Sequence, residues 1–567
     1  MIPVIAVGVV IVSTLGLSSI GLRYARTTSN FFVASRSVHP VWNAFAVSGE
    51  AMSAASYLGL PALLMVFGVD LLWALIGWTV GLFALSLFIA APVRRFGAYT
   101  IPEFIESRMD APLLRPVVAG MVILATWIFL LAQLKGAGVI FRHLLGTPYW
   151  VGVVAVGIIV AINLTSGGMR GITFVQGFQF FFIFAGILVP FVVLASLWVG
   201  GRLGPIVDDE PPRFSESTAV DYELDTVLEV TEPTTVIVDG TIAERSGLAE
   251  FDSPAMLYPG SYEVGAGTTI TWPAGSAAPF NSRFPQLDDQ SWSAPFKGEG
   301  LPGGSPVYFA IATFVANAFG IMGLPHIVVR FHTNPTGREA RLTGVWFLAM
   351  IVPYYAMLPL LAAAARVVSP GLFGSGAVDT ATVTVGGALD GLGGELVTAL
   401  VSAGAVAAFL STSSGLLIVI AGAVSHDILG AGVSAFRRTL WVGAAVSIAG
   451  GLFVESINIA SLIGWSSSIA ASSICPLLIL GIWWPDFTRR GAWAIVIIGG
   501  GTASIATLAA FIRADSSGWI GGLLDIPALW TVPLAFAAGI IGSRTDTTPV
   551  RDLTHKFALM HLPDAAT

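Results

Sequence analysis

The chain has 567 residues, of which 55% are hydrophobic and only 11% are charged. Soluble domains carry about 25% charged residues, so this composition excludes an ordinary soluble protein and indicates a chain that crosses a membrane many times. A single cysteine, Cys475, excludes an intramolecular disulfide. The first apolar run has no positive segment before it, so we expect a retained span and not a cleaved signal peptide.

The net charge of −7 is unevenly distributed along the chain. Residues 205–304 hold 17 acidic and 4 basic side chains, whereas the rest of the chain has an excess of bases. The acidity therefore belongs to one insert, and it gives no reason to expect nucleic acid as a partner.

Apolar runs long enough to cross a bilayer predict about thirteen transmembrane helices. They lie near 3–23, 41–67, 69–92, 113–143, 148–166, 172–199, 305–328, 342–366, 394–425, 438–455, 457–482, 491–512 and 526–543. Loops that follow odd-numbered spans are rich in arginine, and the opposite loops are poor in it. The positive-inside rule then predicts a multi-pass protein of the cell membrane, with its N-terminus and insert outside and residues 544–567 as a cytoplasmic tail.

The insert differs in kind from the spans around it. Residues 227–247, "VLEVTEPTTVIVDGTIAERSG", alternate β-branched with polar side chains and contain an Asp-Gly turn. This pattern is typical of strand–turn–strand. We therefore expect residues 200–304 to form a small extracytoplasmic β-rich module, with a loosely ordered loop as the alternative.

Two of the spans carry polar interruptions. Residues 45–63 read "FAVSGEAMSAASYLGLPAL", and residues 313–331 read "TFVANAFGIMGLPHIVVRF". They belong to the second and seventh spans, the separation expected of two five-helix repeats. Interrupted spans at matching positions of two halves point to a transporter's midplane site, where unwound carbonyls can hold a cation. A kinked structural helix is the alternative.

The ninth span offers oxygen ligands to such a cation. In "AVAAFLSTSSGLLIVIAGAVSHD", residues 405–427, Ala408, Ser411 and Thr412 lie at i, i+3 and i+4 on one helical face. Two hydroxyls and a carbonyl opposite a broken helix would suit a small hard cation. Alternatively, each hydroxyl could bond to the carbonyl four residues before it.

Six stretches together resemble the sodium:solute symporter family, and within it the acetate and monocarboxylate permease branch. They are "GEAMSAASYLGLPA" (49–62), "RRFGAYTIPEFIESRM" (94–109), "LLAQLKGAG" (130–138), "SGGMRGITFVQ" (166–176), "GLPHIVVRFHTNPTGREAR" (323–341) and "GAVSHDI" (422–428). The resemblance implies an all-α membrane protein with the leucine-transporter fold. Its inverted five-helix repeats would be 41–199 and 305–482, with additional spans at 3–23 and within 491–543.

The resemblance also implies a sodium site. Its ligands would be the carbonyls of Gly49, Met52 and Ala408 and the hydroxyls of Ser411 and Thr412. Some members link an acidic residue of the fifth core helix to a further sodium. The aligned residue here is Gln176, so a second sodium is not assigned.

The remaining candidates for substrate binding or coupling are Glu50, Ser53, Ser56, Gln133, Lys135 and Asn317. Glu50 could be a hydrogen-bonded structural group, a charge near the sodium or a proton acceptor. Lys135 could attract a carboxylate, pair with Glu50 or extend to the outer interface, and Gln133 can offer amide donors. A structural role is expected for His326, and cytoplasmic topology is taken to explain Arg170, Arg330 and His426.

The predicted function is sodium-coupled import of a short monocarboxylate of the acetate, propionate or pyruvate class. Proton coupling or a different small solute are alternatives, and a sensor without transport, a channel and a membrane enzyme are less favoured rivals. No metal cluster, nucleophile elbow or phosphate loop supports an enzyme. Expected partners are the carboxylate, the sodium ion and the bilayer. A small accessory membrane protein is a further candidate, and the oligomeric state is left open.

Overall fold

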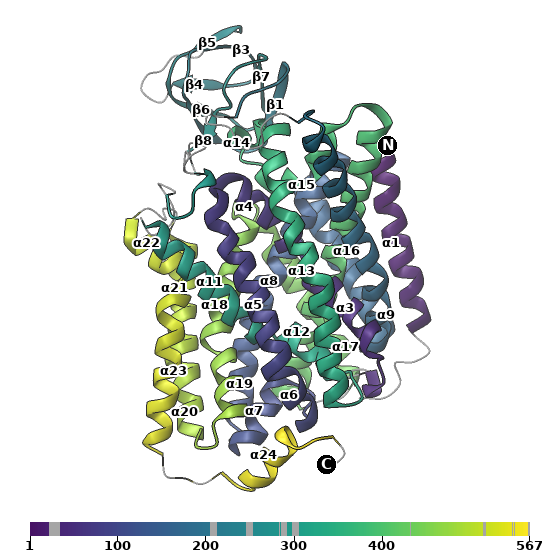
Figure 1. Ribbon diagram of the computed structural model, residues 1–567, viewed down its shortest axis with the longest axis vertical. Coiled ribbons are helices and arrows are strands. Elements are labelled where there is room, and N and C mark those ends of the chain that lie inside the picture. The colour runs from purple at the N-terminus through teal and green to yellow at the C-terminus, as the bar shows by residue number, and fades with distance from the viewer. Residues whose placement is uncertain are drawn as a thin grey trace.

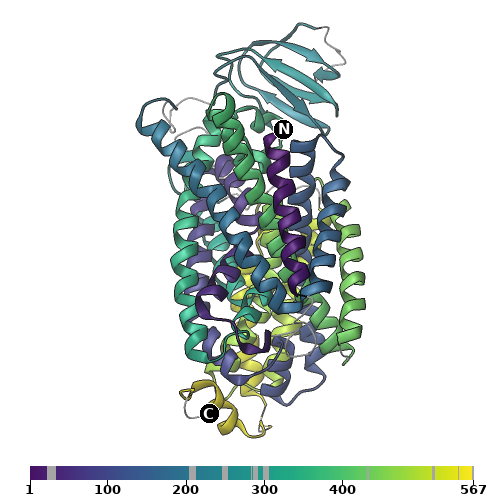
Figure 2. The same ribbon diagram turned by 90° about the vertical axis from the view of Figure 1, so that its right-hand side faces the viewer.

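A computed structural model describes residues 1–21, 34–203, 212–244, 253–282, 284, 292–297, 305–430, 433–513, 518–546, 548 and 550–564. Outside these residues lie Arg23 and Arg26, two of the arginines in the loop after the first predicted span, and parts of the predicted insert. The described chain is mostly helical, with one small β-structure (Figures 1 and 2).

The first half of the chain forms helices before the insert. They are α1 (Ile2–Gly21), η1 (Ala34–Arg36), α3 (Pro40–Ala51), η2 (Ala55–Gly59), α4 (Leu60–Phe67), η3 (Gly68–Leu71), α5 (Leu72–Ala84), η4 (Leu85–Ile89), α6 (Ala90–Phe96), α7 (Ile101–Met109), α8 (Leu114–Leu145) and α9 (Tyr149–Val199). Helix α9 contains a break at Gly168, where φ is 54° and ψ is −167°. That break divides it into the two spans predicted at 148–166 and 172–199.

The helices after the insert continue the bundle. They are α11 (Pro306–Gly323), α12 (Pro325–Phe331), α13 (Gly337–Val368), α14 (Gly371–Ser375), η5 (Val378–Thr380), α15 (Ala381–Thr384), η6 (Val385–Ala388), α16 (Gly391–Gly422), η7 (Ala423–Ile428), α17 (Val433–Leu452), α18 (Ile459–Ser472), α19 (Ile474–Trp483), α20 (Arg489–Ala494), η8 (Ile495–Gly500), α21 (Gly501–Ile512), α22 (Gly518–Asp525), α23 (Ala528–Arg544) and α24 (Leu553–His561).

Within the described residues, nine helices are long and apolar enough to span a membrane. A tenth span results if α22 and α23, bent by 56° at their junction, count as one. Over its described residues each predicted span is mainly helical, and the predicted polytopic helical class is confirmed. The count of thirteen and the division into domains remain predictions.

Both polar interruptions are real breaks in the helices. Helix α3 ends at Ala51, Met52 leaves the helical region with ψ at 69°, and a π-helical turn, η2, follows. The second break is at Leu324, with ψ at 112°, between α11 and α12. Pro325 explains it, because proline disfavours helical backbone in the preceding residue and fits the first position of a new helix.

The predicted β-rich module is also present. Its strands are β1 (Thr218–Tyr222), β2 (Thr226–Val230), β3 (Thr234–Asp239), β4 (Ile242–Glu244), β5 (Ala255–Leu257), β6 (Gly260–Val264), β7 (Thr268–Trp272) and β8 (Phe280–Asn281). They form two antiparallel four-stranded sheets, in the orders β1-β7-β3-β5 and β4-β6-β2-β8. Alternate residues point inward in β3, which accounts for the period-two pattern of the sequence.

The Asp-Gly turn does not close a hairpin. Strands β2 and β4 belong to one sheet, whereas β3, which lies between them in sequence, belongs to the other. The chain therefore crosses between sheets at each turn and builds a sandwich whose core includes Leu228, Ile270 and Trp272. Sequence periodicity predicted the strands, but their pairing partners lie up to about fifty residues away.

The sandwich lies at the same end of the bundle as the N-terminus, and the C-terminus with α24 lies at the opposite end (Figure 1). Phe280 packs on Phe373 of α14, and Glu223 pairs with Arg142 of α8 at 2.7 Å. At the other end, Arg95 of α6 pairs with Asp564 at 3.0 Å. The sandwich and the N-terminus thus share one end of the bundle, and which end faces outside stays a prediction.

Candidate functional site

The break after α3 lies against α16 near the middle of the bundle. The Thr412 hydroxyl donates to the carbonyl oxygen of Glu50 at 2.7 Å. The Ser411 hydroxyl is fully buried and has no hydrogen-bond partner among the described residues. Neither hydroxyl bonds to the carbonyl four residues earlier, whereas Ser414 does, to Leu410 at 2.7 Å. The alternative of simple back-bonding is therefore wrong for Ser411 and Thr412.

A buried ion pair lies directly behind this break. The Arg330 guanidinium contacts the Glu50 carboxylate, and the two side chains are 0% and 1% exposed. Arg330 also donates to Gln176, whose amide donates to the Ser411 carbonyl oxygen at 2.8 Å. The prediction that topology alone explains Arg330 is wrong, because this side chain points into the protein and holds the broken helix.

Two glycines make room for this arrangement. A Cβ on Gly415 would lie 1.6 Å from Oε1 of Glu50, so the carboxylate occupies the space that any other residue would fill. A Cβ on Gly49 would lie 2.8 Å from the Gln176 carbonyl oxygen, so α3 and α9 approach closely there. Oε1 of Glu50 has no hydrogen-bond partner among the described residues.

These observations concern the same face of α16. Ser411 and Gly415 are four residues apart, so they lie one above the other on the helix. One stripe of α16 therefore carries Ser411 Oγ and lies against Glu50 Oε1, two buried oxygens for which the described residues offer no hydrogen-bond partner. Buried polar atoms normally have partners. This oxygen-rich stripe is chemically suited to a small hard cation.

A small cavity lies between the two breaks. Glu50, Ser53, His326, Tyr355 and Trp78 bring polar groups to its lining, and the other lining residues are Ala51, Ala55, Phe129, Ile321, Leu324 and Ile327. Its volume of about 20 Å³ leaves little room for bulky groups. Of the predicted substrate candidates, Glu50 and Ser53 line this cavity.

The other candidates support the breaks or lie elsewhere. Gln133 accepts a hydrogen bond from the Ala54 N–H at 2.8 Å, which satisfies a donor that the unwound turn exposes. Ser56 lies 3.3 Å from the Tyr354 hydroxyl, and Asn317 donates to the Thr313 carbonyl oxygen within its own helix.

Lys135 has a partner that the sequence did not reveal. Its ammonium donates to Asp379 of η5 at 2.9 Å and to the Ile457 carbonyl oxygen. The pairing of Lys135 with Glu50 is therefore wrong, and so is its extension to the interface, since the side chain is 5% exposed. Lys135 ties α8 to the segment between α13 and α16.

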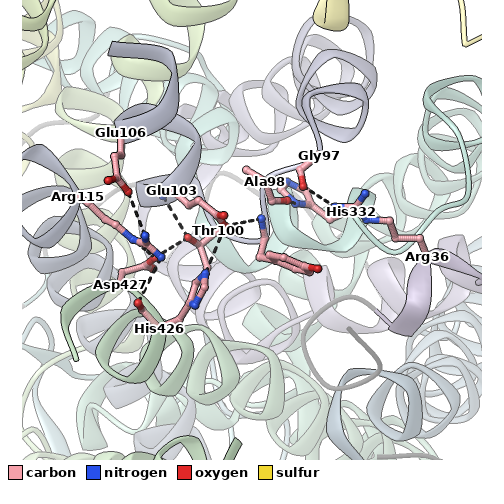
Figure 3. A network of polar contacts seen from close by, with 11 residues as sticks. Arg36, Gly97, Ala98, Thr100, Glu103, Glu106, Arg115, His332, His426 and Asp427 are labelled. Carbon is pink, nitrogen blue, oxygen red and sulfur yellow. Dashed lines mark hydrogen bonds and ion pairs between the residues drawn. The ribbon is translucent and has the colours of Figure 1, made fainter. Parts of the chain in front are cut away.

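A second polar network lies towards the C-terminal end (Figure 3). Asp427 of η7 accepts from Thr100 at 2.8 Å and from Arg115 at 2.9 Å. His426 lies 3.4 Å from Glu103 of α7. Burial opposes ionisation of Glu103, but hydrogen bonds from His426 and the Tyr99 N–H outweigh it and hold the pKa of Glu103 below its usual range. His426 therefore takes part in a network and does not serve only as a topological charge.

This network borders a second cavity of about 40 Å³. Thr100 and Asp427 line one side of it, and Pro325 and Met169 line another. Because Pro325 begins α12 at the second break, this cavity lies between the central site and the C-terminal end of the bundle.

Sequence reasoning missed several residues of the site, namely Arg330 and the cavity residues Trp78, Phe129, His326 and Tyr355. One signal could have found two of them. His326 and Arg330 are four residues apart after a helix-starting proline, so they share one face of α12.

Comparison with known proteins agrees with this arrangement. Residues 31–203 and 297–499 match the model of the sodium:solute symporter family. A monocarboxylic acid transporter of Corynebacterium glutamicum is 28% identical, over 95% of this chain and 91% of its own length. An uncharacterized symporter of Bacillus subtilis is 25% identical, over 94% of this chain and 91% of its own.

Among solved structures, a Na⁺-coupled sialic acid symporter in a substrate-bound outward-open state matches 96% of this chain and 98% of its own, with a TM-score of 0.61 and 13% identity. This likeness concerns the fold, which is the predicted leucine-transporter type. A helical membrane protein with two matched broken helices around a buried polar centre is built as a transporter. The chain belongs to the sodium:solute symporter family. The β-sandwich lies in the stretch that separates the two matched segments.

Proposed function

We propose that this protein is a secondary active symporter that imports a short-chain monocarboxylate, of the acetate, propionate or pyruvate class, together with sodium. The observation that carries the proposal is the buried Glu50–Arg330 pair, which adjoins unpartnered oxygens on one side and a small, largely apolar cavity on the other. The name of the Corynebacterium relative supports a monocarboxylic acid as the substrate class.

The sodium ligands in this proposal are the carbonyls of Gly49, Met52 and Ala408 and the hydroxyls of Ser411 and Thr412. The contact between Thr412 and the Glu50 carbonyl supports it, because it brings α16 against the unwound turn. The carboxylate of Glu50 adds negative charge beside these ligands.

Charge balance gives a physical reason for coupling. The Glu50–Arg330 pair is neutral as a whole, and it is fully buried. Sodium alone would leave one uncompensated positive charge in a poorly solvated site, and a carboxylate alone would leave one negative charge. Together they restore neutrality, so each ligand raises the affinity for the other, and this coupling must be reciprocal.

In this mechanism the N-terminal end, which carries the sandwich, faces outside, and the C-terminal end faces the cytoplasm. Sodium and substrate bind at the two breaks, and rocking of the bundle against the remaining helices then opens the route towards Asp427. The cavity of about 40 Å³ near Thr100 and Asp427 lies along that route. The network of Figure 3 would have to separate for release.

The deciding experiment is uptake by the purified full chain in liposomes. A panel of labelled short carboxylates is offered under an inward sodium gradient, under a proton gradient, and with neither. We expect accumulation of at least one carboxylate above its external concentration only with sodium. Proton-driven accumulation would favour the proton-coupled alternative, and equilibration without accumulation would indicate a channel. Absence of any uptake would favour a sensor or another solute.

Removal of the hydroxyl ligands gives a more local prediction. We expect Ser411→Ala and Thr412→Ala each to raise the sodium concentration for half-maximal uptake, because each removes an oxygen from a small site. The loss of one ligand should cost about 1–3 kcal/mol, by analogy with an unmet buried polar group. Ser402→Ala is the matched control on the same helix, since the Ser402 hydroxyl bonds to the Thr398 carbonyl oxygen. Unchanged sodium dependence in both test variants would show that the ligands are wrongly assigned.

A further inference from the structure

The His326 imidazole occupies an unusual position in the central cavity. It is 1% exposed and lines the cavity beside Glu50 and Ser53. Its Nδ1 has no hydrogen-bond partner among the described residues. Its ring packs against Phe129, with ring centres 5.2 Å apart. A buried ring nitrogen without a partner is expected to serve a ligand or a water, because leaving it unmet is costly.

The location of His326 follows from the break in the seventh span. Leu324 is extended, Pro325 starts α12, and His326 is the next residue. Arg330 lies one turn further along and is occupied by Glu50. The first turn of helix α12 therefore places the His326 imidazole at the cavity, and the next turn places Arg330 against Glu50.

The cationic side chains nearest this cavity are already engaged, so a carboxylate there would depend on neutral donors. Arg330 is engaged by Glu50, Gln176 and Thr173, and Lys135 is engaged by Asp379. The Ser53 hydroxyl oxygen accepts from the Ala55 N–H at 3.2 Å, which leaves its own O–H able to donate, and the Tyr355 hydroxyl also lines the cavity. The walls are mainly aliphatic and aromatic. Among these lining groups, His326 is the one with a buried ring nitrogen, Nδ1, that has no hydrogen-bond partner among the described residues.

We propose that His326 binds the carboxylate of the transported substrate by donating a ring N–H to it. The proposal rests on the proposed function and adds a residue that sets substrate affinity. A neutral imidazole is sufficient, because one nitrogen carries a proton in either tautomer. The cavity of about 20 Å³ has room for about one water, so it must widen to admit a short carboxylate, whose alkyl tail would then meet the rings of Phe129, Trp78 and Tyr355.

The test compares three variants in liposomes and in detergent. His326→Phe keeps a ring but removes both nitrogens, His326→Asn keeps a donor near the position of Nδ1, and Phe129→Leu alters the wall without touching a polar group. Substrate binding to the purified chain is measured in detergent as the rise in unfolding temperature that acetate, propionate or pyruvate causes in saturating sodium. Sodium binding is measured separately, without carboxylate.

We expect His326→Phe to raise the KM for the carboxylate by about 10- to 100-fold, the effect of losing one hydrogen bond to a charged group. The sodium concentration that gives half-maximal stabilisation without carboxylate should stay within about twofold of the wild-type value, because the proposed sodium site lies beside α16. His326→Asn should recover a substantial part of the affinity. Phe129→Leu should change the preference among chain lengths more than the affinity for the shortest acid.

The outcomes separate this proposal from the function it depends on. A wild-type protein that binds none of the carboxylates would overturn both. A wild type that transports a carboxylate, with unchanged KM in His326→Phe, would overturn the role of His326 alone and assign the imidazole to water or packing. Equal losses of sodium and carboxylate binding in His326→Phe would show a structural residue and would likewise contradict the proposal.

Discussion

Arg330→Met should nearly abolish uptake and strongly destabilise the protein. The substitution leaves the Glu50 carboxylate buried without its counter-charge, while methionine fills much of the same volume. Breaking a buried pair by removing one partner typically costs about 3–5 kcal/mol. The measurements are the unfolding temperature in detergent and sodium-driven uptake in liposomes. The exposed Arg341, changed to Met, is the matched control and should behave as wild type.

The double variant Glu50→Gln with Arg330→Met separates stability from function. It removes both charges, and replacing a buried ion pair by neutral groups is often close to neutral for stability. We expect recovery of most of the unfolding temperature without recovery of sodium-driven uptake. If Arg330→Met alone kept wild-type stability and uptake, the pair would have no role in the site, and topology would after all be a sufficient account of Arg330.

The sequence predicted the fold well because membrane burial leaves a strong local signal. A span requires about twenty apolar residues, and a break within it requires proline, glycine or polar side chains, all of which are visible in one stretch. The breaks at Met52 and Leu324 could therefore be placed from the sequence. The strands of the insert were visible for the same local reason, through their alternation.

The partners of the charged residues could not be predicted in the same way. Glu50 and Arg330 are 280 positions apart, and Lys135 and Asp379 are 244 apart. No local pattern states which cation meets which carboxylate once the helices pack. Pairing Glu50 with Lys135, the one lysine within a predicted span, was reasonable, but the packing of α12 and η5 gave each a different partner.

Arg330 also shows why topology misleads near a broken helix. Arginine at the end of a span normally marks the cytoplasmic side. Here α12 is only the second half of a broken span, and Arg330 points back into the protein towards Glu50. A charge that follows a break by one or two turns should therefore be examined first for a buried partner.

Two of the three interpretations of Glu50, a structural group and a charge near the sodium, are compatible with its contacts. One carboxylate oxygen, Oε2, contacts Arg330, as a structural group would. The other, Oε1, has no hydrogen-bond partner in the described part of the chain and lies over Gly415, on the face of α16 that carries Ser411. A structural bond and a charge beside sodium are thus compatible, because they use different oxygens.

Glu50→Gln should raise the sodium concentration for half-maximal uptake by at least about tenfold, which corresponds to about 1.4 kcal/mol. Glutamine keeps the shape and can still accept from Arg330, but it removes the negative charge beside the ion. Gly415→Ala tests the same oxygen without changing charge, since its Cβ would take the place of Oε1. We expect a similar loss of sodium affinity from it. Gly464→Ala is the matched control, because a Cβ there meets nothing within 4 Å.

A pH gradient distinguishes the remaining role of Glu50. If this residue carried a proton during transport, wild-type uptake would respond to an imposed pH gradient without sodium, and Glu50→Gln would lose that response. We expect no such uptake in either protein, because the Glu50 carboxylate is held by Arg330 in a fully buried contact. Near-normal sodium dependence in both Glu50→Gln and Gly415→Ala would instead make Glu50 a scaffold that only anchors Arg330, and the sodium ion would then have to be held by the carbonyls and hydroxyls without it.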